Sequence, residues 1–158
     1  MSSRVADPMS HAATPLLSWS EMQRSWPQRT LAEAAYQGTI ELFERPPTLD
    51  AGRRRPVTFR IANNGTEHWP GLEREPRIAV SHRWLTAPSS GAGSWSATCL
   101  PASLECGASA LVPVPIEAPP NAGPHTLELA LVHDDPRRPQ APRRFAAIQL
   151  PVDVQGAA

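Results

Sequence analysis

Apolar and polar residues alternate with a period of two along most of this chain, from Gly38 to Val154. This alternation is typical of β-strands that bury one face, and Pro, Gly and Asn-Gly sequences separate the runs. We predict seven strands, which lie at Thr39–Glu44, Val57–Ile61, Arg77–Leu85, Ser94–Leu100, Leu111–Ile116, Leu127–Leu131 and Ile148–Val154. Pro113 and Pro115 lack amide hydrogens, so the fifth strand is predicted to lie at a sheet edge.

The region before Gly38 has a different pattern. Residues 1–15 are polar and small, and we expect them to be disordered. Residues 16–37 have helical character, and Pro27 divides them into two short helices, the second around Leu31–Gln37. Three large apolar residues of the first helix share one face: Trp19, Met22 and Trp26. That face either packs on the strands or docks on another protein.

Short strands joined by turns indicate an all-β, immunoglobulin-like antiparallel β-sandwich of about seven strands, over residues 38–155, with a short helical N-terminal extension. The 19 prolines exclude long helices from most of the chain. Of the large side chains, Trp84 alternates with Ile78 and Val80 and is assigned to the core. Trp69 follows an Asn-Gly turn and is expected to plug one end of the sandwich.

Charge and composition narrow the classes of partner. Fifteen basic and fifteen acidic residues balance, which does not favour nucleic acid or an anionic membrane. No apolar run approaches the roughly 20 residues that span a bilayer, so we expect no membrane insertion. The N-terminus lacks a continuous apolar segment like that of a secretory signal, which predicts a cytoplasmic protein. Cys99 and Cys106 would then be reduced thiols rather than a disulfide.

Several short stretches together resemble a known family of domains. The run Val57–Gly65 followed by Trp69, the strand Ile78–Leu85, and the turns Leu100–Gly107 and Ala118–Leu127 carry the resemblance. They resemble bacterial immunoglobulin-like accessory domains found beside glycosyltransferases and methyltransferases of surface-polysaccharide pathways. They are also similar to the four-tryptophan immunoglobulin-like domain of autophagy receptors. The pairs around Leu131–His133 and Phe145 resemble the last two strands of such domains.

The resemblance implies a non-catalytic module that assists bacterial cell-surface polysaccharide synthesis or modification by docking on a glycosyltransferase-type partner. The first docking surface to consider is the helical face with Trp19, Met22 and Trp26. The alternatives are a carbohydrate-binding protein and a structural subunit of a larger protein assembly. For glycan binding, the candidate residues are Trp95, His82 and Arg83, because a Trp beside polar groups stacks on sugar rings. Trp95 at a sheet edge could equally serve only to cap the fold.

The sequence offers no set of residues typical of an enzyme. It contains no G-x-S-x-G, no phosphate-binding glycine loop and no H-E-x-x-H, so we predict no catalytic activity and no cofactor. The spacing of Cys99 and Cys106 does not suggest a metal site, and His82 is expected to be a hydrogen-bonded core or edge histidine. Two arginine clusters would hold phosphate if they met in space: Arg53–Arg55, and the set Arg137, Arg138, Arg143 and Arg144.

Overall fold

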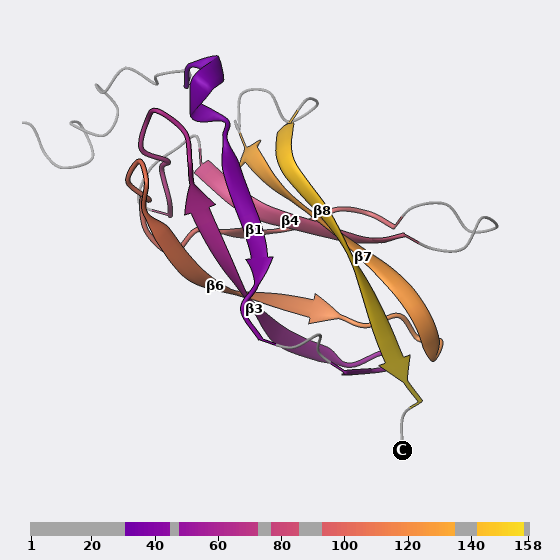
Figure 1. The fold of residues 1–158 in the computed structure, drawn as a ribbon. Helices are drawn as coiled ribbons and strands as arrows, with labels where there is room; N and C mark the ends of the chain where they lie inside the picture. The colour runs from indigo at the N-terminus through magenta and orange to yellow at the C-terminus, as the bar shows by residue number, and fades with distance from the viewer. Residues whose placement is uncertain (1–30, 45–47, 73–76, 86–92, 135–141, 157–158) are drawn as a thin grey trace, which may run out of the picture.

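A computed structural model describes residues 31–44, 48–72, 77–85, 93–134 and 142–156 of the chain (Figure 1). These residues form eight β-strands and one turn of 3-10 helix, Glu33–Ala35. The predicted disorder of residues 1–15 and the predicted face with Trp19, Met22 and Trp26 lie outside the described residues. No helix within them is long and apolar enough to cross a membrane.

The strands form two sheets. The three-stranded sheet has the order β1 (Gly38–Leu42), β3 (Arg54–Asn63) and β6 (Ser109–Glu117). The five-stranded sheet has the order β2 (Leu49–Asp50), β8 (Arg143–Gln155), β7 (Gly123–Asp134), β4 (Arg77–Leu85) and β5 (Ser96–Cys99). All neighbouring strands are antiparallel except β2, which runs parallel to β8.

The order of the strands defines the fold. The chain passes from β3 in the first sheet to β4 in the second, returns from β5 to β6, and crosses again to β7. Such crossings between two packed antiparallel sheets are the connections of an immunoglobulin-like sandwich. The protein is therefore an all-β, immunoglobulin-like sandwich. Each of the seven predicted strands is present, and the two-residue strand β2 is an addition to them.

The period-two pattern explains the core between the sheets. Alternate residues of β3 point inward and are almost fully buried: Val57, Phe59 and Ile61. On β6 the same holds for Val112, Val114 and Ile116, and on β7 for Leu127, Leu129 and Leu131. β6 ends the order of its sheet, so the edge position predicted from Pro113 and Pro115 is confirmed.

Trp69 closes one end of the sandwich, as predicted. Its side chain is fully buried, and its Nε1 donates a hydrogen bond of 2.8 Å to the carbonyl oxygen of Ala35. The ring packs edge-on against Phe145 and lies so close to Gly38 that a Cβ there would stand 2.4 Å from it. The indole therefore joins β1, β8 and the 3-10 turn.

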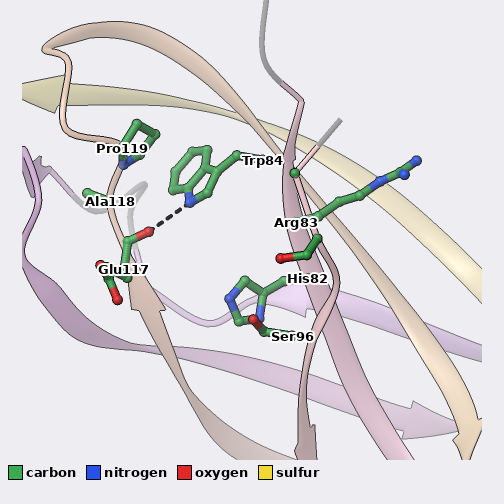
Figure 2. Close-up of a pocket in the computed structure, with 9 residues that line it drawn as sticks. His82, Arg83, Trp84, Ser96, Glu117, Ala118 and Pro119 are labelled. Carbon is green, nitrogen blue, oxygen red and sulfur yellow. Dashed lines mark hydrogen bonds between the residues drawn. The ribbon is translucent and has the colours of Figure 1, made fainter. Parts of the chain in front are cut away.

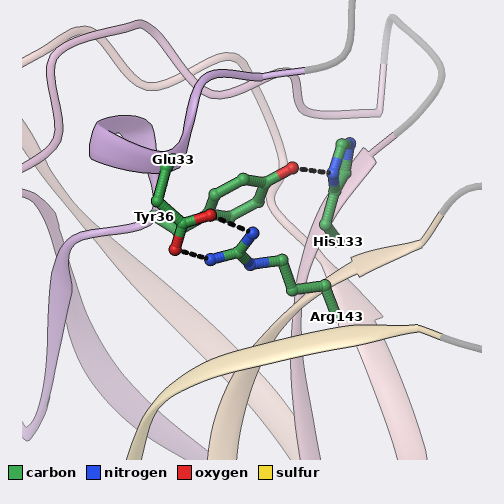
Figure 3. A network of polar contacts seen from close by, with 4 residues as sticks. All are labelled: Glu33, Tyr36, His133 and Arg143. Atoms are coloured by element: carbon green, nitrogen blue, oxygen red, sulfur yellow. Dashed lines mark hydrogen bonds and ion pairs between the residues drawn. The ribbon is translucent and has the colours of Figure 1, made fainter.

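A second set of contacts ties the 3-10 turn to the five-stranded sheet (Figure 3). The guanidinium of Arg143 binds both carboxylate oxygens of Glu33 and lies 3.8 Å from the ring centroid of Tyr36. The Tyr36 hydroxyl forms a 2.8 Å hydrogen bond with Nδ1 of His133. Because Glu33 is exposed, its pair with Arg143 positions the turn more than it stabilises the fold.

The predicted helix over Leu31–Gln37 is wrong, because only one 3-10 turn forms there. Its N-cap residue, Ala32, makes no side-chain cap hydrogen bond. The Ala35 carbonyl, which a longer helix would use internally, accepts from Trp69 instead. Tertiary contacts therefore override the local helical preference.

Asn63 organises the loop that carries Trp69. Its side chain is fully buried, with Nδ2 donating to the carbonyl oxygens of Glu67 and Leu104 and Oδ1 accepting from the amide of Gly65, each at 2.9 Å. These three bonds bring distant backbone segments together. A buried loop of this kind is stable only when its polar groups are paired.

Replacing Asn63 with Ala should lower the free energy of unfolding by about 2 to 4 kcal/mol, because three backbone groups lose their hydrogen bonds to its side chain, two of these bonds being buried. Asn64→Ala is the matched control, because the neighbouring side chain is exposed, and it should change stability by less than about 0.5 kcal/mol. Urea unfolding followed by circular dichroism measures both. Equal stability losses in the two variants would contradict this role of Asn63.

Candidate functional site

A groove runs along one open side of the sandwich, between the edge strands β5 and β6. Each of these strands ends the order of its sheet. The groove consists of two adjoining hollows of about 250 and 170 Å³, which share His82, Ser96 and Glu117. We call this feature the edge groove. Its further lining residues include Arg54, Trp84, Ser94, Thr98, Pro115 and Pro119.

His82 forms the floor of the edge groove. It lies in β4 on the face that carries Ile78 and Val80, and it pairs in register with Ser96 of β5. The side chain is 7% exposed, and its Nδ1 has no hydrogen-bond partner among the described residues. The sequence predicted a hydrogen-bonded core or edge histidine; the structure buries the side chain but leaves its Nδ1 without a partner among the described residues.

The groove favours the neutral form of His82. Burial lowers the pKa of its imidazole below the ordinary value, and the nearby positive charge of Arg54 lowers it further. Near neutral pH the ring is therefore uncharged, with one nitrogen able to donate and the other able to accept a hydrogen bond. A neutral imidazole of this kind suits a polar, uncharged ligand.

Trp84 forms one wall of the groove and links the two sheets (Figure 2). Its Nε1 donates a 2.8 Å hydrogen bond to the backbone carbonyl of Glu117, at the end of β6. The ring is half-buried and meets His125 edge-on. Trp84 is predicted to belong to the core; the structure packs it against the core but leaves it only partly buried, and its position at the open side brings it into the groove. The exposed carboxylate of Glu117 completes this end.

The three residues predicted to bind glycan are not brought together. His82 and Arg83 both border the groove, but the side chain of Arg83, the next residue in the strand, points away from it (Figure 2). Arg83 lies on the outer face of the five-stranded sheet, where its guanidinium carbon is 4.5 Å from the ring centroid of Trp95. Side chains next to each other in a strand point to opposite faces, which explains the separation.

Trp95 contacts charged side chains on the outer face of the five-stranded sheet. A second guanidinium carbon, that of Arg144, lies 4.4 Å from the same ring centroid. The ring is half-buried, so it is neither a fully exposed stacking platform nor a core residue. Arg83 also forms a 2.5 Å ion pair with Glu128, its register partner on β7.

Sequence reasoning missed Trp84, Glu117 and Arg54 as members of one site. They lie on three strands, and no local pattern shows that β5 and β6 leave an open side between them. The available signal was His82 itself, because a histidine at a core position of an alternating strand marks a place where the core opens to polar groups.

The remaining predicted clusters lie apart. Cys99 is half-buried and Cys106 exposed, and neither forms a disulfide. Arg54 lies at the edge groove, whereas Arg143 and Arg144 begin β8 in the other sheet, and Arg137 and Arg138 lie outside the described residues. Among the described residues no three His, Cys, Asp or Glu side chains group closely enough to hold a metal ion.

No protein-family model matches the chain, and no curated protein matches it either. Among solved structures it is similar to PapD-like domain 7 of human CEP192, an ASH / PapD-like domain, with 14% identity over 98% of this chain and all of that one, at a TM-score of 0.39. The CARDB domain of the Pyrococcus furiosus PF1109 protein, solved with di-metal ions, is 11% identical, with coverage of 81% and 96% and a TM-score of 0.45.

A third similar structure is the Pseudomonas fluorescens alkylpurine DNA glycosylase AlkC bound to DNA that contains an abasic site analog. The identity is 15%, and the match covers 75% of this chain but 30% of that one, at a TM-score of 0.44. Likenesses this distant say nothing about function. The fold assignment rests on the strand order described above.

Stability should decrease as the pH falls below about 6.5, because the unfolded chain then binds a proton that the lowered pKa of folded His82 excludes. His82→Gln removes this contribution, so its unfolding free energy should fall less between pH 7 and pH 5. His68→Gln, at an exposed position, is the control. Urea unfolding at both pH values measures the difference, and a wild-type pH dependence in His82→Gln would contradict the assignment.

Proposed function

We propose that this protein is a non-catalytic binding module whose edge groove takes an uncharged sugar residue of a glycan. The observation that carries the proposal is a neutral, largely buried His82 that lines the groove beside the half-buried ring of Trp84. Sugars present hydroxyl groups at the edge of the ring and C–H groups on its faces. An aromatic wall next to polar atoms complements both features.

The other lining groups fit the same ligand. Ser94, Ser96 and Thr98 provide hydroxyls that donate and accept, and Glu117 provides an acceptor at the rim. The two adjoining hollows make an open groove rather than an enclosed pocket, which suits an internal residue of a chain. The aromatic residue of the proposed glycan site is thus Trp84, in place of Trp95, whereas His82 keeps its proposed role.

The wider role that we propose is assistance in the synthesis or modification of a bacterial cell-surface polysaccharide, beside a glycosyltransferase-type partner. Two observations support it: the resemblance of the strand and turn sequences to accessory domains of these pathways, and a groove with chemistry suited to a glycan. In this proposal the groove binds glycan, and the face predicted from the sequence for Trp19, Met22 and Trp26 docks on the partner protein.

Filling the groove should abolish glycan binding. In Ser96→Met a longer side chain occupies the space above His82, whereas Ser109→Met changes another exposed strand serine on the outer side of β6. Titration with neutral di- and trisaccharides should change the tryptophan fluorescence of the wild type and of Ser109→Met, with at least roughly tenfold weaker binding in Ser96→Met.

Two results would contradict the groove as a glycan site. One is the absence of any fluorescence response across a panel of glucose, galactose and N-acetylglucosamine oligosaccharides. The other is equal binding by Ser96→Met and the wild type. Chromatographic detection of cleaved saccharides after incubation would instead contradict the non-catalytic assignment.

The docking surface has its own test. Replacing Trp19, Met22 and Trp26 with Ser should remove capture of a glycosyltransferase encoded beside this gene, because an apolar anchor is lost. The far-ultraviolet circular dichroism of the strands should stay unchanged. Undiminished capture of that enzyme by the triple variant would exclude this face as the docking surface.

A further inference from the structure

We infer that the outer face of the five-stranded sheet carries a second binding site, for an anionic group such as a phosphate or carboxylate, formed by Arg83 and Arg144 around Trp95. This site lies on the opposite side of β4 from the edge groove. Arg83 also borders the edge groove, but its guanidinium points away from it toward Trp95, so this site neither requires nor excludes glycan binding in the groove.

Three segments distant in the sequence build this arrangement, which we call the arginine–tryptophan cluster. Arg83 comes from β4, Arg144 from the start of β8, and Trp95 directly precedes β5. The guanidinium carbons lie 4.5 and 4.4 Å from one indole centroid. At these distances each cation is attracted to the electron-rich face of the ring. The ring therefore holds two like charges near each other, at positions set by the sheet.

Stacking leaves the hydrogen-bond donors of the arginines available. A guanidinium contacts an aromatic ring with its flat face, while its five N–H groups point outward in its own plane. Arg83 uses its Nε for Glu128. Among the described residues, none accepts a hydrogen bond from the terminal nitrogens of Arg83 or from Arg144. These donors are preorganised, because the ring has already fixed the side chains that carry them.

The balance of charge selects the ligand. Within the arginine–tryptophan cluster, two guanidinium groups and the carboxylate of Glu128 leave one positive charge in excess. Phosphate and carboxylate groups match the fork of a guanidinium with two parallel hydrogen bonds. Ser81 and Ala130 lie on the same face and are 1% exposed. Because their side chains are small, longer side chains can lie over them.

The experiment is a titration of the protein labelled with ¹⁵N, in which the indole N–H resonance of Trp95 is assigned by its loss in Trp95→Phe. Inorganic phosphate and glucuronate are the two probes, each at constant ionic strength, and sodium chloride is the blank. We expect a saturable shift of the Trp95 resonance with at least one probe. A response to phosphate alone, or to glucuronate alone, identifies which anion the site takes.

Variants of the arginines separate binding from a structural role. Arg144→Gln should weaken binding by roughly tenfold or more, because the charged donors are lost. Arg144→Lys keeps the charge and the long stem but loses the paired donors, so it should also bind more weakly. Arg60→Gln, an exposed arginine on β3 of the other sheet, is the matched control and should bind as the wild type does.

The inference fails if sodium chloride produces the same shift as the probes, if neither probe produces a saturable shift, or if Arg144→Gln and Arg144→Lys bind with wild-type affinity. An equal loss in Arg60→Gln would also overturn it, because attraction would then follow net charge alone. The groove variant Ser96→Met should retain the phosphate or glucuronate response. Its behaviour therefore distinguishes failure of this site from failure of the proposed glycan site.

Discussion

The alternation of side chains along β4 decides which chemistry each side of this protein carries. His82 and Arg83 are consecutive, yet the pleat of the strand sends the imidazole toward the other sheet and the guanidinium outward. A neutral ring in the edge groove and a cation on the outer face follow from this one constraint. A shift of β4 by one residue would exchange the two environments and bury a charge, which the fold cannot tolerate.

The edge groove exists because an immunoglobulin-like sandwich has open sides. β5 and β6 end their sheets, and a bare strand edge exposes backbone groups that can pair with other chains. β5 is short, and β6 carries Pro113 and Pro115, which remove amide donors. The hydrogen bond from Trp84 to the Glu117 carbonyl then joins the sheets across this side. The same features that protect the edge thus leave a shallow space lined by side chains.

Whereas the side between β5 and β6 is open, the end of the sandwich at Trp69 is closed. At this end the indole of Trp69 excludes water from the core. Its buried N–H therefore needs a hydrogen-bond acceptor within the protein. The Ala35 carbonyl provides that partner, which is why a segment with helical character forms a single 3-10 turn. Gly38 has no Cβ because the indole occupies that space. The helical preference of this segment was overridden because the indole of Trp69 binds the Ala35 carbonyl, which a longer helix would have used.

The sequence was sufficient to predict the strands, their inward residues and the edge position of β6. Each depends on the residues of a single strand, either on its two-residue repeat or on its prolines. The same repeat placed His82 on the apolar face of its strand, as a core or edge histidine. The tertiary structure alone decided which strands became neighbours, and so placed Trp84 and Glu117 beside His82 and brought Arg144 to Trp95. Those contacts join residues far apart in sequence, and no local pattern encodes the distance between two strand edges or the partner of an aromatic ring.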